Sequence, residues 1–462
     1  MSEKKSDLQM PRTSFFPRLF SYWPILVVLL TGLTSRLFLY LNITPRLHTD
    51  SVTYLILEDL WTIRTPGYPQ FIEIIQFFND LFSLTSNYLG LILFVQIFIL
   101  GLLNVGLIYV LARKLTGSTA FAVCVGILYN VNYFVLGFEL LVLTETLAIT
   151  LLLLTLFFYL KIYESNWKYA WVAGLCSAFL LLTRPVFQIF FLVLVGITIL
   201  LHLRKKERGF FFKKFGKAIV IFLIINLAGI LSWSLRNKIK FDYFGMSTIM
   251  PYQLYHHTKH FFHKYKFGEE PEIDLYAKIF EEVGYNDSQF NERLAREFEM
   301  NPVQISQAFL KLNLKLIKDN PVDYLKQIPP ASTQYYLTYS PYWTTYYNNK
   351  LLTGPGIFPG IYRSVFQVFQ KLYSSIWLLI LFVLLLPVLL LFLVRKDKPV
   401  FHLFLIIEAA IHYNFLISVL STNAGVNNVR YRVPVEPLII LVYLAALFLL
   451  ARTLFKRLRK AT

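Results

Sequence analysis

Residues 20–41 read FSYWPILVVLLTGLTSRLFLYL, an apolar run with a single charged residue, Arg36. A run of about 20 apolar residues is long enough to cross the hydrocarbon core of a bilayer as an α-helix. Similar runs recur along the chain, and 56% of its 462 residues are hydrophobic. The mean hydropathy of +0.54 is above that of ordinary soluble chains. The sequence therefore predicts an all-α polytopic membrane protein.

The apolar runs predict about ten transmembrane helices. Lys and Arg collect in the loops after every second run and in both tails, and the segment 204–217 alone holds seven of them. Such loops stay in the cytoplasm by the positive-inside rule, so both termini are predicted to be cytoplasmic. The predicted spans lie near 20–41, 88–111, 119–136, 144–161, 167–182 and 185–202, then one ending at 233, then 376–394, 401–420 and 433–450.

The chain is predicted to form one membrane unit with a helical extracytoplasmic insertion. Residues 1–235 form an N-terminal transmembrane module with a first outer loop at 42–87, and residues 373–462 form the C-terminal transmembrane helices. In the insertion, 236–372, the pattern predicts helices over 274–283 and 286–298 and a third from Asn301-Pro302 to Asn320-Pro321. The aromatic stretch 335–347 is typical of the lipid headgroup level, with a sugar-binding face as the alternative.

The formal charge of +18 would suggest a nucleic-acid partner in a soluble protein. Here the excess collects in short loops and tails on one side of the predicted membrane, so no nucleic-acid partner is expected. The lipid bilayer is the expected partner. Cys124 and Cys176 both lie in apolar runs and indicate neither a disulfide nor a zinc site.

The first outer loop carries a carboxylate and a guanidinium in a short stretch. It reads HTDSVTY at 48–54 and RTPGYP at 64–69, so that Arg64 begins a turn rich in Pro and Gly. A carboxylate and a guanidinium together suit chemistry on a hydroxyl and a phosphate. A solvated loop with ordinary turn residues is the alternative for Asp50 and Arg64.

Further charged residues fall at the outer ends of predicted spans, where the positive-inside rule expects few arginines. Snorkelling to headgroups would explain single cases. A guanidinium, however, binds phosphate through two oxygens in a way that lysine does not. The position of these arginines beside Pro or aromatic residues therefore favours a lipid-phosphate site that opens to the outer leaflet. The charged residues are Glu139, Glu145, Arg184, Arg236, Arg430 and Arg432.

The sequence resembles the GT-C glycosyltransferases at these residues. More narrowly, it is similar to the bacterial members of the protein O-mannosyltransferase and aminoarabinose transferase superfamily (glycosyltransferase family 39-like). The resemblance implies a GT-C type fold in a bacterial inner (plasma) membrane and a polyprenyl-phosphate sugar as donor. The motifs that carry it are Asp50-Ser51 with Tyr54, Arg64-Thr-Pro-Gly-Tyr-Pro69, Leu143-Thr-Glu145, Thr183-Arg-Pro185, Trp233-Ser-Leu-Arg-Asn237 and Arg430-Tyr-Arg-Val-Pro434.

The resemblance also implies roles for individual residues, with Asp50 as the catalytic base and outer arginines on the donor phosphate. A lipid phosphate leaves already ionised, so one carboxylate and a set of cations suffice for inverting transfer of a hexose or pentose to a lipid, glycan or protein. Glu145 is expected to orient an arginine, touch the acceptor or form a structural ion pair. The candidates are Asp50 as base; Arg64, Arg184, Arg236 and one of Arg430 or Arg432 on the phosphate; and Glu145, Tyr54 and His48 near the acceptor, with a plain surface position as the alternative for His48.

No cofactor is expected. Many relatives carry Asp-Glu in the first loop where this chain has Asp50-Ser51, and this difference removes one candidate metal ligand. A metal-independent mechanism is therefore favoured, although a divalent metal stays an open alternative.

A membrane transporter or lipid flippase is the alternative function. Glu408 and His412 lie four residues apart in one predicted span and so share a helix face. Ionisable pairs inside a membrane are often functional, but a structural pair between helices accounts for them equally simply. A non-catalytic assembly subunit is a third possibility, and it predicts no dependence of function on Asp50.

Overall fold

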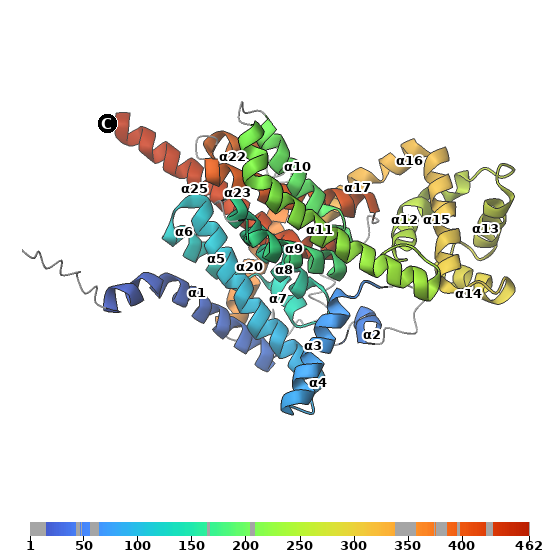
Figure 1. Ribbon diagram of the computed structural model, residues 1–462, viewed down its shortest axis with the longest axis horizontal. Helices are drawn as coiled ribbons and strands as arrows, with labels where there is room; N and C mark the ends of the chain where they lie inside the picture. The colour runs from blue at the N-terminus through green and yellow to red at the C-terminus, as the bar shows by residue number, and fades with distance from the viewer. Residues whose placement is uncertain are drawn as a thin grey trace, which may run out of the picture.

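The computed structural model describes residues 15–42, 47, 49–55, 64–163, 167–203, 208–337, 357–373, 375, 386–394, 398–421 and 428–461. In this part of the chain all regular secondary structure is helical (Figure 1). Six helices among the described residues are long and apolar enough to cross a membrane. The chain is therefore a multi-pass, all-α membrane protein.

The six candidate spans match six of the runs expected from the sequence. They comprise Tyr22–Asn42 of α1 (Phe15–Asn42), Tyr88–Thr116, Glu145–Tyr163 (α8), Phe215–Phe241 of α11 (Arg208–Phe241), Pro399–Ser421 of α23 (Lys398–Ser421), and Arg430–Lys456. The second of these is built from α4 (Tyr88–Phe94), the π-helix η1 (Val95–Leu100) and α5 (Gly101–Thr116); the last contains α24 (Asn428–Arg432), η5 (Val433–Val435) and most of α25 (Glu436–Ala461).

Three shorter apolar helices lie where further spans were expected. They are α6 (Thr119–Asn130), α9 (Tyr169–Thr183) and the segment Pro185–Leu201, which comprises η2 (Pro185–Phe187) and most of α10 (Phe190–Leu203). The run expected at 119–136 ends early, because Asn132 caps a separate short helix, α7 (Tyr133–Glu139), by accepting a bond from the Phe134 amide. The expected span at 376–394 lies largely outside the described residues, and only α22 (Leu386–Val394) is described there. The count of about ten spans stays a prediction.

Helix α8 lies at the centre of the membrane core. Most of its residues are buried, and it packs against α9 on one side and α5 on another. A helix that is apolar all round is expected in such a fully enclosed position. The site residue Glu145 is the first residue of this helix, so the most enclosed helix of the bundle fixes its place.

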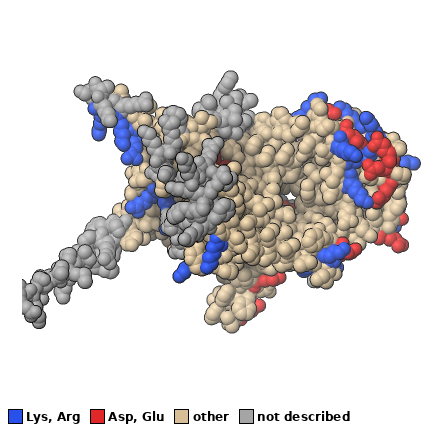
Figure 2. Space-filling view, turned by 45° about the horizontal axis from the view of Figure 1, so that its top comes forward, with Lys and Arg blue, Asp and Glu red and all other residues tan. Residues whose placement is uncertain are grey.

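The described part of the insertion 236–372 has a hydrophobic core of its own, which includes the fully buried rings of Phe280, Phe290 and Phe309. Its helices are α12 (Met250–Thr258), η3 (Lys259–Lys264), α13 (Pro271–Glu282), α14 (Asp287–Glu297), α15 (Pro302–Asp319) and α16 (Pro321–Lys326). The helices expected from the sequence are confirmed: Asn286 caps α14, and Asn301 forms a capping box with Gln304 at the start of α15. Figure 2 shows charged side chains gathered over this unit and a broad uncharged surface beside it.

The aromatic stretch at 335–347 was expected at the lipid headgroup level. Its first three residues end α17 (Ile328–Leu337), where Tyr335 and Tyr336 are buried against Phe415 of α23, and their depth in the membrane stays a prediction. The Tyr335 hydroxyl donates to the side chain of Asn414. The rest of the stretch lies outside the described residues. Two aromatic residues thus hold α17 to a membrane span.

The remaining described helices lie beside the core. They are α2 (Thr49–Leu55), α3 (Gly67–Phe82) and α20 (Ile357–Tyr373). Helices α2 and α3 pack on each other, and α3 packs on α9. They therefore bring the first loop against the end of the bundle where α9 stops and α8 begins.

Candidate functional site

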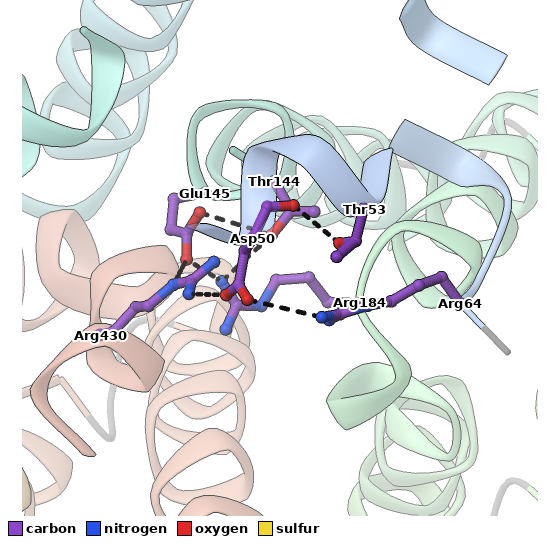
Figure 3. A network of polar contacts seen from close by, with 7 residues as sticks. All are labelled: Asp50, Thr53, Arg64, Thr144, Glu145, Arg184 and Arg430. Atoms are coloured by element: carbon purple, nitrogen blue, oxygen red, sulfur yellow. Dashed lines mark hydrogen bonds and ion pairs between the residues drawn. The ribbon is translucent and has the colours of Figure 1, made fainter. Parts of the chain in front are cut away.

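Five separate stretches of chain bring charged side chains to one point, shown in Figure 3. Asp50 lies in the first turn of α2, and Arg64 lies just before α3. Glu145 begins α8, Arg184 directly follows α9, and Arg430 is in α24. The sequence predicted that all five would meet on one side of the membrane, and the structure brings them into one network.

Asp50 contacts two guanidinium groups from distant parts of the chain. One carboxylate oxygen lies 3.5 Å from Nη2 of Arg64, and the other accepts a hydrogen bond from Nη1 of Arg430. Thr53 stabilises the short helix by donating to the Asp50 backbone carbonyl at 2.7 Å. Asp50 is thus held between two arginines, with 30% of its side chain exposed.

Glu145 joins two further arginine contacts at the buried side of the site. Its Oε1 accepts a bond from Nη1 of Arg184 at 2.9 Å and a second bond from Nε of Arg430. The Thr144 hydroxyl lies 3.4 Å from its Oε2 and 3.5 Å from Arg184. None of the Glu145 side chain is exposed, so its direct role is to hold Arg184 and Arg430 side by side.

The charges of this network do not balance. Among the described residues, three guanidiniums (Arg64, Arg184, Arg430) face two carboxylates (Asp50, Glu145), so the formal sum is 3 − 2 = +1. Asp50 and Arg64 are the partly exposed members, whereas Arg184 and Glu145 are enclosed. An anion entering from the exposed side therefore meets an excess of positive charge in a partly desolvated setting, where the attraction is stronger than in water.

Aromatic rings and one glycine hold Arg64 in place. Its guanidinium lies 5.3 Å from the ring centre of Tyr54, which packs edge-on against Tyr68. Gly67 packs directly on the backbone of Thr183, where an added Cβ would lie 2.6 Å from the Thr183 nitrogen. Only glycine fits such a close approach. The loop of Arg64 is thereby fitted against the turn that carries Arg184.

Arg432 and Arg236 lie in other surroundings. Arg432 is fully buried, where it donates to Glu436 at 2.8 Å and to the carbonyls of Tyr335 and Tyr336. Arg236 packs over the rings of Trp233 and Phe241 and donates to Asn237, all near the end of α11. Of the two arginines that flank Tyr431, the structure brings Arg430 to Asp50. His48 lies outside the described residues.

A buried ion pair behind the site was not singled out from the sequence. Arg36 of α1 donates to Glu139 at 2.7 Å and to the Asn130 side chain at 3.1 Å, and its guanidinium is entirely enclosed. The available signal was Arg36 itself, because a lone charge in a membrane span needs a partner. Glu139 ends α7, six residues before Glu145 begins α8. The pair therefore anchors the segment that leads to Glu145.

Glu408 and His412, which the sequence placed on one helix face in the run 401–420, form a pair in the structure. Glu408 Oε2 lies 3.0 Å from His412 Nε2 on α23, with the carboxylate mostly buried and the imidazole partly exposed. Both residues lie on α23, and this geometry suits a local structural pair as well as an ionisable site.

In the described part of the chain, no set of the usual metal ligands surrounds Asp50. Among the described residues there is no group of three or more His, Cys, Asp or Glu side chains placed to hold an ion. Two arginines contact Asp50, and they repel a divalent cation and attract an anion. The donor set fits a phosphate better than a metal.

The chain matches no protein-family model and no curated protein. Among solved structures it is similar to the archaeal oligosaccharyltransferase AglB from Archaeoglobus fulgidus, solved with an inhibitory peptide and a dolichol-phosphate. The TM-score is 0.48 at 12% sequence identity, and the match covers 97% of this chain and 52% of AglB. The chain thus spans about half the length of that protein, and a likeness at this level assigns it neither a fold family nor an activity.

Proposed function

We propose that this protein is a membrane glycosyltransferase of GT-C type, which moves a sugar from a polyprenyl-phosphate donor to a hydroxyl acceptor on the extracytoplasmic face. The observation that carries the proposal is the contact of Asp50 with Arg64 and Arg430 in a network of net positive charge. A base beside a phosphate-binding set is what this transfer requires, because one substrate loses a proton while the other releases a phosphate.

The reaction follows from these roles. Asp50 accepts the proton of the acceptor hydroxyl as that oxygen forms a bond to the anomeric carbon of the donor sugar. The bond from this carbon to the phosphate oxygen breaks, and the lipid phosphate leaves with the electron pair. Attack opposite the leaving group inverts the configuration at the sugar carbon. Arg64, Arg184 and Arg430 neutralise the charge on the departing phosphate.

Donor binding and activation of the base are coupled in this geometry. Asp50 occupies contacts on Arg64 and Arg430 that phosphate oxygens would take over. A bound phosphate therefore competes with Asp50 for the guanidiniums and releases its carboxylate toward the acceptor. Loss of the two arginine contacts favours the protonated form of Asp50 and so makes it a better proton acceptor.

Glu145 serves as an orienting residue. Its buried carboxylate holds Arg184 and Arg430 close together, so that both can contact oxygens of one phosphate. Tyr54 serves the same purpose for Arg64 through its ring. Arg236 stays a candidate for a more distant part of the donor, since its surroundings are aromatic.

A donor assay tests the proposal. Purified protein is incubated with a panel of labelled polyprenyl-phosphate sugars and membrane extract, beside Asp50→Asn and Asp80→Asn. Asp80 is an exposed carboxylate on α3 outside the network and serves as the matched control. Transfer of label that is lost in Asp50→Asn and kept in Asp80→Asn supports the proposal; near-normal transfer by Asp50→Asn shows that Asp50 is not the base.

The same donors in sealed vesicles distinguish transport. The Glu408–His412 pair is the observation behind a flippase or transporter. Movement of intact labelled donor across the vesicle membrane, without transfer and with loss in Glu408→Gln, would establish that function instead.

A further inference from the structure

A buried glutamine connects the segment that carries Arg64 to the turn that leads to Glu145. Gln96 lies in the π-helix η1, and none of its surface is exposed. Its Nε2 donates to the carbonyl of Leu141 at 2.7 Å and lies 3.4 Å from that of Glu139. Its Oε1 accepts a hydrogen bond from the hydroxyl of Tyr68. Both ends of the amide are therefore in use, on two different segments.

Each of these contacts leads to a residue of the proposed site. Leu141 lies in the turn between α7 and α8, four residues before Glu145. Tyr68 follows Arg64 in the first loop, and its ring packs against Tyr54, which supports the Arg64 guanidinium. Burial raises the pKa of the Tyr68 phenol well above its ordinary value, so the hydroxyl keeps its proton and donates to Gln96.

The π-helix accounts for the direction in which Gln96 points. The Gly101 amide bonds to the Gln96 carbonyl, an i→i+5 bond that places these two residues on one face. A Cβ on Gly101 would lie 2.8 Å from the Glu139 carboxylate, so both residues face the end of α7. In a regular α-helix, residues five apart point about 140° away from each other. The π-turn thus allows one helix to pack against Glu139 at Gly101 and to bond the Leu141 carbonyl through Gln96.

We propose that Gln96 is a positioning residue, which fixes the Arg64 loop relative to the turn that carries Glu145. This inference rests on the proposed function for its catalytic consequence, because the two segments bring the phosphate-binding arginines together. Gln96 touches neither substrate. It sets the spacing between Arg64 on one side and the pair of Arg184 and Arg430, held by Glu145, on the other.

Gln96→Leu removes both contacts at similar side-chain volume, and Tyr68→Phe removes one hydroxyl while keeping the ring. Asn226→Leu is the matched control, because Asn226 is a buried amide that bonds within its own helix, to the Phe222 carbonyl at 2.8 Å. We expect kcat to fall about 10- to 100-fold in Gln96→Leu, because small misplacements of reacting groups have effects of this size, and the donor KM to rise by a smaller factor, because the phosphate-binding arginines are displaced. Tyr68→Phe is expected to show a smaller fall and Asn226→Leu none.

Hydrogen exchange gives a second readout that does not depend on activity. In Gln96→Leu we expect faster amide exchange in residues 67–72 and 141–144, and unchanged exchange there in Asn226→Leu. If the wild-type protein transfers no sugar but this exchange pattern is seen, the proposed function fails and the structural role of Gln96 stands. Equal exchange in the two variants overturns the inference, as does wild-type kcat in Gln96→Leu. Should Gln96→Leu not fold, Tyr68→Phe carries both measurements.

Discussion

Arg36 and Glu139, 103 residues apart in the chain, form a 2.7 Å ion pair that is almost completely enclosed in the membrane bundle. The pair connects the first span to the end of α7, just before the turn into Glu145. Charges in such surroundings are retained only with a partner, because burying an isolated charge is very costly. The fold of the site therefore depends on a contact that lies outside it.

Removing one member of this pair is expected to destabilise the protein strongly. Glu139→Gln leaves Arg36 buried without its counterion, which costs about 3–5 kcal/mol for pairs of this kind. The measurement is the unfolding midpoint in detergent. Glu272→Gln, which breaks the exposed contact with Lys311, is the control and is expected to have almost no effect. A midpoint for Glu139→Gln equal to that of the control would contradict a stabilising role.

Gly67→Ala is expected to damage the site by moving the Arg64 loop. The added methyl group would meet backbone atoms of Leu182 and Thr183 at 2.6–2.7 Å, and backbone cannot shift as a flexible side chain does. We expect a cost of about 1–3 kcal/mol in stability together with a loss of transfer activity. Gly106→Ala, which meets nothing within 4 Å in the interior of α5, is the control. Equal activity of the two variants would show that the close approach has no functional importance.

The sequence predicted the fold class and most of the site because each signal was local. Apolar runs specify spans by length alone, and the Asn and Pro residues at 286, 301 and 302 specify helix starts in the insertion. Asp50, Arg64, Arg184 and Arg430 were recognised because charge at the outer end of a span is unusual. The structure brings these four into one network, whereas Arg236 and Arg432, recognised by the same signal, lie in other surroundings.

The sequence did not show which residue each arginine contacts. Arg430 and Arg432 are two residues apart with similar neighbours, yet one contacts Asp50 and the other Glu436. Which of them faces the site depends on the direction of α24, a tertiary property. The same holds for Gln96, whose direction follows from a π-turn that no local pattern indicates.

The helical insertion, whose core contains Phe280, Phe290 and Phe309, is expected to loosen in acid. Hydrogen bonds from Lys315 and from the Gly268 amide hold the pKa values of Glu269 and Asp274 below their usual range. A carboxyl group whose pKa is lower in the folded than in the unfolded protein stabilises the fold at a pH above its unfolded-state pKa. This stabilisation is lost as the pH falls through the folded-state pKa, so we expect the loss below about pH 4. Hydrogen exchange of α13 and α15 measured down to pH 3 should show faster opening there. Protection independent of pH would contradict this.

Chelation is expected to leave transfer unchanged. Asp50 has arginine neighbours, so a divalent cation would be repelled where the phosphate binds. Activity is compared before and after EDTA treatment, with added Mg²⁺ and Mn²⁺ as the restoring control. If EDTA abolishes transfer and Mg²⁺ or Mn²⁺ restores it, the reaction depends on a metal.

Arg430→Lys and Arg432→Lys are expected to fail in different ways, although both keep the charge. Lysine at 430 cannot contact Asp50 and Glu145 at once as the guanidinium does, so phosphate binding should weaken while the fold is kept. Lysine at 432 cannot reproduce the fully buried contacts with Glu436 and two backbone carbonyls, so the unfolding midpoint should fall first. Donor KM and unfolding midpoint are measured for both variants. The assigned roles would be wrong if Arg432→Lys raised the donor KM at an unchanged unfolding midpoint, while Arg430→Lys lowered the midpoint at an unchanged KM.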